Sequence, residues 1–229
     1  MRYEGKVEPK RIGVPQGSPI SPLYSNIYLN LIDRVGHARG YPEKLGATLH
    51  RYADDVILVC RRNANQALAA FKAIARRMDL TLNQDKTKIT PLREGFNFIG
   101  FEFVKRRSPS NGKQRIYIFP SKRQERNIRH KIRSFTRRRA PIKPDELVRQ
   151  INQAVLGWAN YYRHTNASQA FRSLQRFINI RFRRYLNYRS KRRGFGWKQF
   201  PNQKLYAMGI IYIGSGFIRY ERATVHARR

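Results

Sequence analysis

The sequence is short of carboxylates and nearly free of sulfur. It holds 14 Asp and Glu against 48 Lys and Arg, which gives a net charge of +34. Its single cysteine, Cys60, excludes an internal disulfide and a cysteine-based zinc site. Because Cys60 lies in the apolar run 56–60, we interpret it as a small buried residue.

A long hydrophobic run is also lacking. The most apolar late stretch, residues 207–218, is too short and too interrupted by glycine to span a bilayer. The first residues, MRYEGKVEPKR, lack the apolar core of a signal peptide. We therefore expect a cytoplasmic protein with no part in the membrane. No internal repeat or low-complexity linker is evident.

What the sequence does contain is enough apolar surface to fold. Hydrophobic residues make up 41% of the chain, too many for a disordered basic tail. A folded protein with this charge favours a polyanionic partner, because neutralising phosphates releases condensed counterions. We expect nucleic acid, and an anionic membrane surface is the main alternative.

Charge divides the chain into two parts. Residues 1–102 hold 16 basic and 10 acidic residues, a net +6, and residues 103–229 hold 32 and 4, a net +28. The first part therefore keeps its carboxylates, whereas the second has lost nearly all of them. This asymmetry predicts that any acidic chemistry lies in the first part and that most polyanion binding lies in the second.

The first part has an α+β pattern. Ser21-Pro22 predicts the start of a helix, which continues with apolar residues at helical spacing as far as Val35. Residues 49–52 and 56–60 are expected as strands around a tight Ala53-Asp54-Asp55 turn. We also expect a helix over residues 64–79 and short strands over 80–82, 87–90 and 98–104.

The second part is predicted to be mainly helical after one hairpin. Asn111-Gly112 is a strong turn signal between residues 101–104 and 116–119. One amphipathic helix is expected over residues 144–162, and a second begins at Ser168, which we expect to cap it. Arginines are predicted on the outer faces of this helical region: Arg163, Arg172, Arg176, Arg181, Arg183 and Arg184. Residues from 190 onward give no clear prediction.

Adjacent carboxylates at a hairpin tip are the sharpest chemical feature. Tyr52-Ala53-Asp54-Asp55 lies between the two apolar strands, and such a tip suits hard divalent cations, which prefer oxygen ligands. Two metal ions about 3.5–4 Å apart can activate an attacking hydroxyl and stabilise a leaving pyrophosphate. The alternative is that Asp is simply a common turn former.

Three further segments have both functional and ordinary interpretations. The run 13–22, GVPQGSPISP, fixes an unusual path before a helix whose N-terminus favours phosphate, or is an ordinary Pro/Gly loop. Lys86, after a predicted turn, could donate a proton to a leaving phosphate or could simply be solvated. Gly100 could allow a nucleic-acid backbone to approach closely, or could mark a bulge.

Together, in this order and spacing, these segments resemble the reverse transcriptases encoded by group II introns. GVPQGSPISPLYSNIYLNLID resembles that family's fourth conserved block, RYADD the fifth, NQDKTKI the sixth and FNFIGF the seventh. The later LGWANYYRH, residues 156–164, is similar to the signature of the maturase or thumb region. The resemblance covers residues 10–165 well and the remainder only through its basic, helical character.

The resemblance implies three regions: a partial palm over residues 1–104, a thumb or maturase region over 105–189, and a basic segment over 190–229. The expected fold class is α+β, an antiparallel palm sheet with packed helices followed by a mainly helical thumb. The implied activity is RNA-directed DNA synthesis by two-metal catalysis, together with assistance to intron splicing. The implied partners are Mg²⁺ (two ions), deoxynucleoside triphosphates, DNA and RNA, the RNA being either the intron or a template–primer duplex.

The resemblance also implies residue roles. Asp54 and Asp55 would bind the metal ions, Asp55 less directly, and Lys86 would lie near the triphosphate. Residues lining the template and nucleotide pocket would be Pro15, Gln16, Gly17, Tyr52 and Ala53. The grip on the primer end would comprise Phe98, Ile99, Gly100 and Phe101. Trp158, Tyr161 and Tyr162 would belong to the thumb, where we favour core packing over base stacking. RNA would be held by Arg163, Arg172, Arg176, Arg181 and Arg184.

Some parts of the family pattern have no match in these 229 residues. The family's earlier palm strand supplies another metal-binding Asp, and its fingers come earlier still; Asp33 cannot replace that Asp, because it lies late in a helix. We expect a truncated or split polymerase, with a separate chain as one source of the missing parts, in a bacterial cytoplasm and associated with nucleoid or ribonucleoprotein. A His/Cys-rich nuclease module is also unmatched. The alternative is a non-enzymatic RNA-binding maturase remnant.

Overall fold

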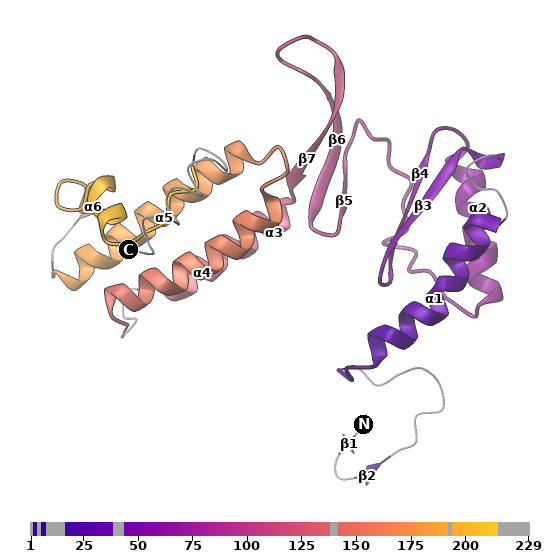
Figure 1. Ribbon diagram of the computed structural model, residues 1–229, viewed down its shortest axis with the longest axis horizontal. Helices are drawn as coiled ribbons and strands as arrows, with labels where there is room; N and C mark the ends of the chain where they lie inside the picture. Colours follow the sequence, from indigo (N-terminus) through magenta and orange to yellow (C-terminus); the bar gives the residue numbers. More distant parts are fainter. Residues whose placement is uncertain are drawn as a thin grey trace. The chain divides into compact units, whose positions relative to one another are not determined.

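The computed structural model describes residues 2–3, 6–7, 17–38, 44–137, 142–191 and 194–214. The chain divides into two compact units, Met1–Pro91 and Leu92–Arg229. Antiparallel strands and helices occur in both (Figure 1). The predicted α+β class is therefore confirmed. The predicted region boundary after residue 104 falls inside a strand, and as a functional division it stays a prediction.

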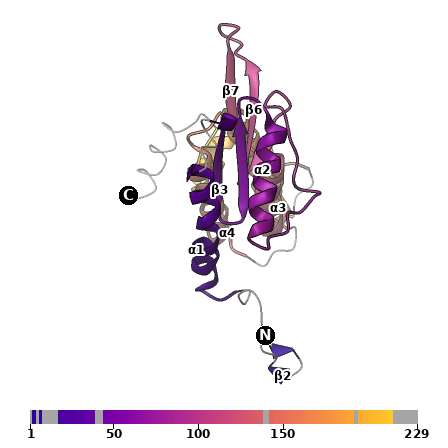
Figure 2. The same ribbon diagram turned by 90° about the vertical axis from the view of Figure 1, so that its right-hand side faces the viewer.

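The first unit is a β-hairpin backed by two helices. Its elements are β1 (Arg2–Tyr3), β2 (Lys6–Val7), α1 (Ser21–Ala38), β3 (Ala47–Tyr52), β4 (Asp55–Cys60) and α2 (Ala64–Arg77). Helix α1 packs along β3 and α2 along β4, so the two helices lie side by side against the hairpin (Figures 1 and 2). The small buried core consists of Ile32, Phe71, Ile74 and Met78.

Helix α1 contributes little to that core. Most of its apolar residues, among them Leu23, Ile27 and Leu31, keep half or more of their surface exposed. The Tyr28 hydroxyl donates to the Met78 carbonyl oxygen at 2.5 Å, which ties α1 to the end of α2. The predicted helix is therefore present, but its apolar stripe is mostly unburied.

The predicted strands at residues 80–82 and 87–90 are wrong. Helix α2 ends at Arg77, and its cap residue, Met78, is followed by the left-handed Asp79 (φ 51°). The Leu80 amide donates back to the Ala75 carbonyl, so the chain reverses there. Asn83 then organises a turn by accepting hydrogen bonds from the Lys86 and Thr87 amides. These local side-chain and cap interactions replace a ladder.

The second unit begins with a three-stranded antiparallel sheet in the order β5-β6-β7. Its strands are β5 (Phe96–Phe98), β6 (Phe101–Arg107) and β7 (Gln114–Pro120). The predicted hairpin around Asn111-Gly112 is confirmed, with Gly112 at φ 66°. The predicted continuous strand 98–104 is wrong, because Ile99 and Gly100 both have positive φ and form a two-residue turn between β5 and β6.

Four helices follow and enclose the main core (Figure 1). They are α3 (Lys122–Phe135), α4 (Pro144–Tyr162), α5 (Ser168–Arg189) and α6 (Asn202–Ala207). Ser121 caps α3 by accepting from the Gln124 amide, whereas the expected cap of α5 is wrong: Ala167 occupies the cap position and makes no side-chain bond. Among the described residues this core cluster holds 21 buried hydrophobic residues, against four in the core cluster of the first unit.

Candidate active site and nucleic-acid interface

The carboxylate pair lies at the tip of the β3–β4 hairpin. Tyr52 pairs with Asp55, so the loop is only Ala53-Asp54 and Asp55 is the first residue of β4 rather than part of the turn. Both carboxylates are exposed. Ala53 has φ 52°, a left-handed conformation that costs an L-residue roughly 1–2 kcal/mol. The strained residue therefore sits directly beside the acids.

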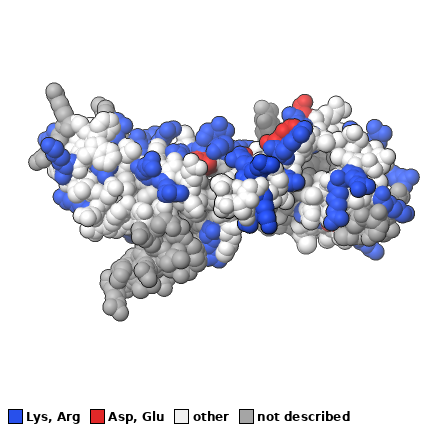
Figure 3. Space-filling view, turned by 90° about the horizontal axis from the view of Figure 1, so that it is seen from above, with Lys and Arg blue, Asp and Glu red and all other residues white. Residues whose placement is uncertain are grey.

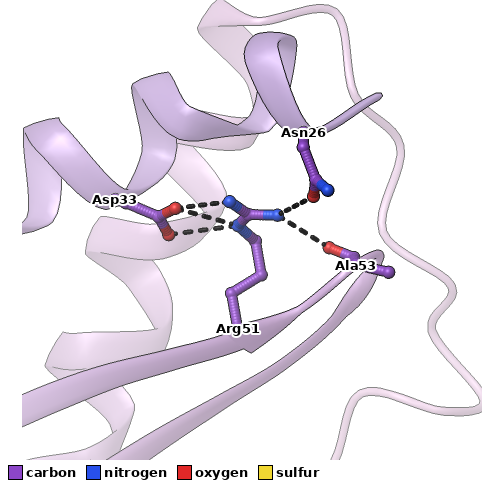
Figure 4. Close-up of polar contacts among 4 residues, drawn as sticks. All are labelled: Asn26, Asp33, Arg51 and Ala53. Carbon is purple, nitrogen blue, oxygen red and sulfur yellow. Dashed lines mark hydrogen bonds and ion pairs between the residues drawn. The ribbon is translucent and has the colours of Figure 1, made fainter. Parts of the chain in front are cut away.

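Arg51 holds this tip to helix α1 (Figure 4). Its Nε donates to both Asp33 carboxylate oxygens at 3.1 Å, and its Nη2 donates to Oδ2 at 2.5 Å. Its Nη1 donates to the Asn26 side-chain oxygen at 3.0 Å and to the Ala53 carbonyl at 3.1 Å. The hydrogen bond with Asp33 raises the pKa of Arg51, and partial burial opposes that shift.

This contact network gives Asp33 a defined role. Asp33 is not among the predicted metal ligands, and its carboxylate is occupied by the guanidinium of Arg51, whose side chain is only 11% exposed. The Arg51 guanidinium donates hydrogen bonds both to side chains of α1 and to the Ala53 carbonyl. These bonds help to hold the strained Ala53 conformation in place. Arg51 is thus a positioning residue for the hairpin tip.

The donor chemistry of the tip suits magnesium. Mg²⁺ in polymerase sites is bound by one or two carboxylates, with waters and substrate phosphates completing the shell. Asp54 and Asp55 supply two exposed carboxylates of this kind. Within the described ranges, no three or more His, Cys, Asp or Glu side chains form a group that could hold a metal. The described residues therefore offer a partial oxygen shell.

Two other predicted residues of the first unit, Gly17 and Lys86, lie outside the helices and strands. Gly17 precedes α1 with φ 86°, and a Cβ added there would meet no atom within 4 Å. Pro15 and Gln16 lie outside the described residues. Lys86 is exposed on the turn organised by Asn83. Their grouping around one substrate stays a prediction.

The predicted primer grip is a rigid hairpin turn in the second unit. The Tyr161 hydroxyl donates to the Ile99 carbonyl at 2.9 Å, and the Tyr162 hydroxyl donates to the Gly100 carbonyl at 3.1 Å. Phe101 stacks on Tyr161 with ring centroids 4.9 Å apart. Burial raises the pKa of Tyr162 to about 12, so its phenol stays a donor.

Gly100 is required by this packing. It has φ +88°, and an added Cβ would lie 3.1 Å from the Tyr162 hydroxyl oxygen. Gly100 is therefore a turn residue pressed against α4, which replaces the bulge interpretation. Trp158 and Tyr162 are buried, as the core-packing interpretation expects, whereas Tyr161 is 53% exposed.

The arginines of the helical region fall into two groups. Arg163, Arg172, Arg176 and Arg184 are exposed, as predicted. Arg181 is half-buried, and it donates from Nε to the Thr136 hydroxyl and from Nη2 to the Thr136 carbonyl. Burial, and then the charges of Arg184 and Arg133, lower the pKa of Arg181. Its guanidinium is thus committed to the end of α3, and its contact with RNA stays a prediction.

Arg183 contradicts the prediction that it lies on an outer face. It is 1% exposed and is the largest fully buried side chain among the described residues. Its Nε donates to the Phe200 carbonyl at 2.8 Å and its Nη2 to the Asn202 side-chain oxygen at 2.6 Å. Arg183 follows the buried Phe182 in α5, and the residues after α5 fold back to cover the Arg183 side chain.

Patches of Lys and Arg are spread over the visible face of the described residues, and they cover far more of it than Asp and Glu do (Figure 3). Acidic side chains are few, and no Asp or Glu occurs between Glu146 and Glu221. No described helix is both long and apolar enough to cross a membrane. This surface suits the phosphate backbone of a nucleic acid.

Two family models match the chain and identify its class. One, described as reverse transcriptase (RNA-dependent DNA polymerase), matches residues 2–103, and the other, described as the group II intron maturase-specific domain, matches residues 125–204. The chain therefore matches a reverse transcriptase and a group II intron maturase domain in two successive segments, as the sequence motifs predict.

A curated relative supports a partial correspondence. The chain is similar to Protein YkfC of Escherichia coli (strain K12), with 30% identity over 147 residues that cover 51% of this chain and 38% of the relative. The chain therefore spans well under two thirds of that relative's length.

Sequence reasoning missed the residues that position the site. Arg51 was read only as part of RYADD, and its partners Asn26 and Asp33 lie on another element. Asn26 and Asp33 are seven residues apart in a predicted helix, and residues at that spacing lie on the same face. This spacing was the one signal in the sequence that the two side chains could bind a common partner. Nothing in the sequence indicated that Tyr161 and Tyr162 bond the turn at Ile99 and Gly100.

Proposed function

We propose that this chain contributes the palm hairpin and the RNA-binding thumb of an RNA-directed DNA polymerase that also acts as a group II intron maturase. The observation that carries the proposal is the exposed Asp54-Asp55 pair on a hairpin tip held by Arg51, in a chain otherwise dominated by positive charge. The reverse transcriptase and maturase matches support the same function.

The hairpin would orient the reacting groups. Asp54, in the turn, would be the more direct metal ligand, and Asp55, the first residue of β4, would be the less direct one. Two Mg²⁺ ions bound there would activate the primer hydroxyl and stabilise the departing pyrophosphate. Lys86 would neutralise the triphosphate, and Tyr52 and Ala53 would line the nucleotide and template pocket with Pro15, Gln16 and Gly17.

The second unit would hold the nucleic acid. The turn 98–101, bonded to Tyr161 and Tyr162, would support the primer end as a fixed element. The exposed arginines Arg163, Arg172, Arg176 and Arg184 would contact phosphates of the template–primer duplex or of the intron RNA. The same surface would serve both substrates, because phosphate contacts carry no sequence information.

A second candidate is an RNA-binding maturase without polymerase activity. It is favoured by the incomplete donor set, since the described residues bring no third carboxylate, His or Cys to a metal site. In that case the fingers, the further palm Asp and any separate chain that supplies them are unnecessary, and the basic surface alone supports splicing.

The test is primer extension by the chain joined to a fingers and upstream palm segment, supplied in the same polypeptide or in trans. Asp54→Asn keeps size and hydrogen bonding but removes the charge, so we expect a rate loss of about a thousandfold or more. Asp79→Asn is the matched control, because Asp79 is an exposed Asp of the same unit at a left-handed position that Asn accepts. It should leave the rate unchanged.

Near-normal extension by the Asp54→Asn enzyme would show that the hairpin is only a turn. If no complementation restores extension to the unsubstituted chain, while intron RNA still binds and splices, the maturase without polymerase activity is the better account.

A further inference from the structure

Three aromatic side chains stand exposed where helix α5 ends. Tyr188 is 44% exposed, and Phe195 and Trp197, in the segment that follows the helix, are each 55% exposed. A large aromatic ring that is left in water forgoes its main contribution to folding. Several such rings close together in the sequence indicate an interaction surface. We name Phe195 and Trp197 the aromatic pair.

The backbone that carries the aromatic pair is fixed onto α5. Gly194 and Gly196 have φ 91° and 73°. The Asn187 side-chain amide donates to the Gly194 carbonyl at 2.8 Å, and a Cβ at Gly196 would lie 3.1 Å from Asn187. The Phe200 amide closes the segment by donating to the Gly196 carbonyl at 2.9 Å. The rings are therefore presented by a shaped loop rather than by a free tail.

A buried guanidinium supports the indole from below. The Arg183 Cζ atom lies 3.8 Å from the Trp197 ring centroid, a stacking distance. Arg183 is itself held by Phe200 and Asn202, and its Nη1 is buried without a hydrogen-bond partner in the described part of the chain. Because one face of the indole rests on this fixed cation, its 55% exposure belongs to the remaining face and edge.

Phe195 has a similar but looser arrangement. The Arg184 Cζ lies 5.4 Å from its ring centroid, and Arg184 follows Arg183 directly on α5. The exposed Lys191 and Lys198 flank the pair in sequence. The pair therefore combines flat apolar faces with fixed positive charge.

Charge identifies the kind of partner. No carboxylate occurs from residue 147 to residue 220, a stretch that includes all of α5, the loop and α6. Basic residues alone would fit a duplex, whose bases are stacked inside. Exposed aromatic rings on a basic surface instead fit unpaired bases, which stack on such rings whatever their sequence.

We propose that Trp197 and Phe195 form a stacking platform for unpaired nucleobases of single-stranded RNA, with Arg183 and Arg184 fixing the rings and phosphates held by the surrounding Lys and Arg. The proposal rests on the RNA-binding function proposed above and adds the class of RNA structure recognised by this surface. It gives residues 190–214 a role separate from the phosphate contacts of the exposed arginines.

The direct test uses Trp197 as its own reporter. The chain has two tryptophans, and Trp158 is buried, so Trp158→Phe leaves Trp197 as the emitting group. The full chain is titrated with an unstructured oligouridylate and with a blunt-ended RNA duplex of equal phosphate number, which has no unpaired bases. Binding is followed separately by anisotropy of labelled RNA. Stacking should quench Trp197 with the single strand and leave it unquenched with the duplex.

Affinity of variants provides the second readout. Trp197→Ala should weaken single-strand binding by about 5- to 150-fold and leave the salt slope unchanged, because no phosphate contact is lost. Trp197→Phe keeps a stacking face and should restore most of the affinity. Ile116→Ala is the matched control, since Ile116 is 58% exposed in the same unit but is not aromatic; it should have no effect.

Two results would overturn the proposal while leaving RNA binding intact. One is saturating single-strand binding without quenching. The other is normal single-strand affinity in a Trp197→Ala chain that circular dichroism shows to be folded. If that variant has instead lost binding to vesicles of mixed phosphatidylserine and phosphatidylcholine, the aromatic pair binds membrane rather than RNA, and the proposal is equally overturned. Absence of any RNA binding by the unsubstituted chain would overturn both this proposal and the function on which it rests.

Discussion

The two units of this chain use their charged residues in opposite ways. The first unit has two acidic residues at an exposed hairpin tip, and Arg51 holds that tip in place through hydrogen bonds to Asp33 and to the Ala53 carbonyl. The second has no Asp or Glu after Glu146 in its described residues and displays arginine instead. Under the proposed function, catalysis and nucleic-acid affinity would be carried by separate residues, so substitutions should be able to disrupt each without the other.

The two units also differ in the size of their hydrophobic cores. The second unit buries many large residues around α4 and α5, whereas the first buries few and leaves much of α1 exposed. Since apolar burial is the main favourable term in folding, the second unit should be the more stable of the two. A stable second unit can tolerate exposed arginines, whose mutual repulsion costs folding energy.

The largest expected effect concerns activity of the chain alone. A polypeptide of residues 1–229 should show no measurable primer extension with Mg²⁺ and deoxynucleotides, because Asp54 and Asp55 offer only part of an oxygen shell. Each 1.36 kcal/mol of lost transition-state stabilisation is about tenfold in rate, and several such losses are expected. Robust synthesis of complementary DNA by this purified polypeptide would contradict the incomplete-shell account.

The next effect sharpens the comparison within the second unit. Arg183→Ala should lower the free energy of unfolding by about 2–4 kcal/mol, because it leaves a cavity and unsatisfied groups at Phe200 and Asn202. Arg176→Ala, on the exposed face of the same helix, should change it by less than about 0.5 kcal/mol. Urea unfolding followed by the buried Trp158 measures both. Equal losses would mean that Arg183 is not the buried support described.

A somewhat smaller effect is expected in the first unit. Arg51→Gln should destabilise it by about 1.5–3 kcal/mol through the lost charge-assisted bonds to Asp33, and it releases the Ala53 carbonyl. In a complemented polymerase, the rate of extension should fall more than nucleotide affinity, since the tip is mispositioned rather than removed. The control is Arg62→Gln, an exposed arginine of the same unit. A normal rate with Arg51→Gln would remove its positioning role.

Sequence patterns predicted the regular parts of this molecule well. The hairpin around Asp54, the turn at Asn111-Gly112 and the helix opened by Pro144 all depend on local signals within a few residues. Helix α3 lies in the region predicted to be mainly helical, but its position was not predicted, because its buried face, Ile128 and Ile132, is sparse among charged residues. The short strands expected at 80–82 and 87–90 were wrong because apolar content alone does not supply a pairing partner.

The candidate site was less predictable than the fold. Motif order located Asp54, Asp55 and Lys86, but Asn26, Asp33 and Arg51 meet only after α1 packs on β3. Arg183 shows the same limit, since helical periodicity cannot foresee that the segment carrying Phe200 folds over it. Contacts between distant segments depend on packing, which local patterns do not encode.

The most direct test of the division of labour is the salt dependence of RNA affinity for two variants of the same chain. Asp54→Asn should give a plot of log Kd against log salt that superimposes on the unsubstituted protein, because removing one carboxylate from a chain of net charge +34 barely alters the long-range field. Arg176→Ala combined with Arg184→Ala should weaken RNA binding. It should also reduce the slope of that plot by roughly 1.4–1.8, the value expected for the loss of two phosphate contacts. If Asp54→Asn changes affinity or slope as much as the double arginine variant, the separation of catalysis from RNA binding is contradicted.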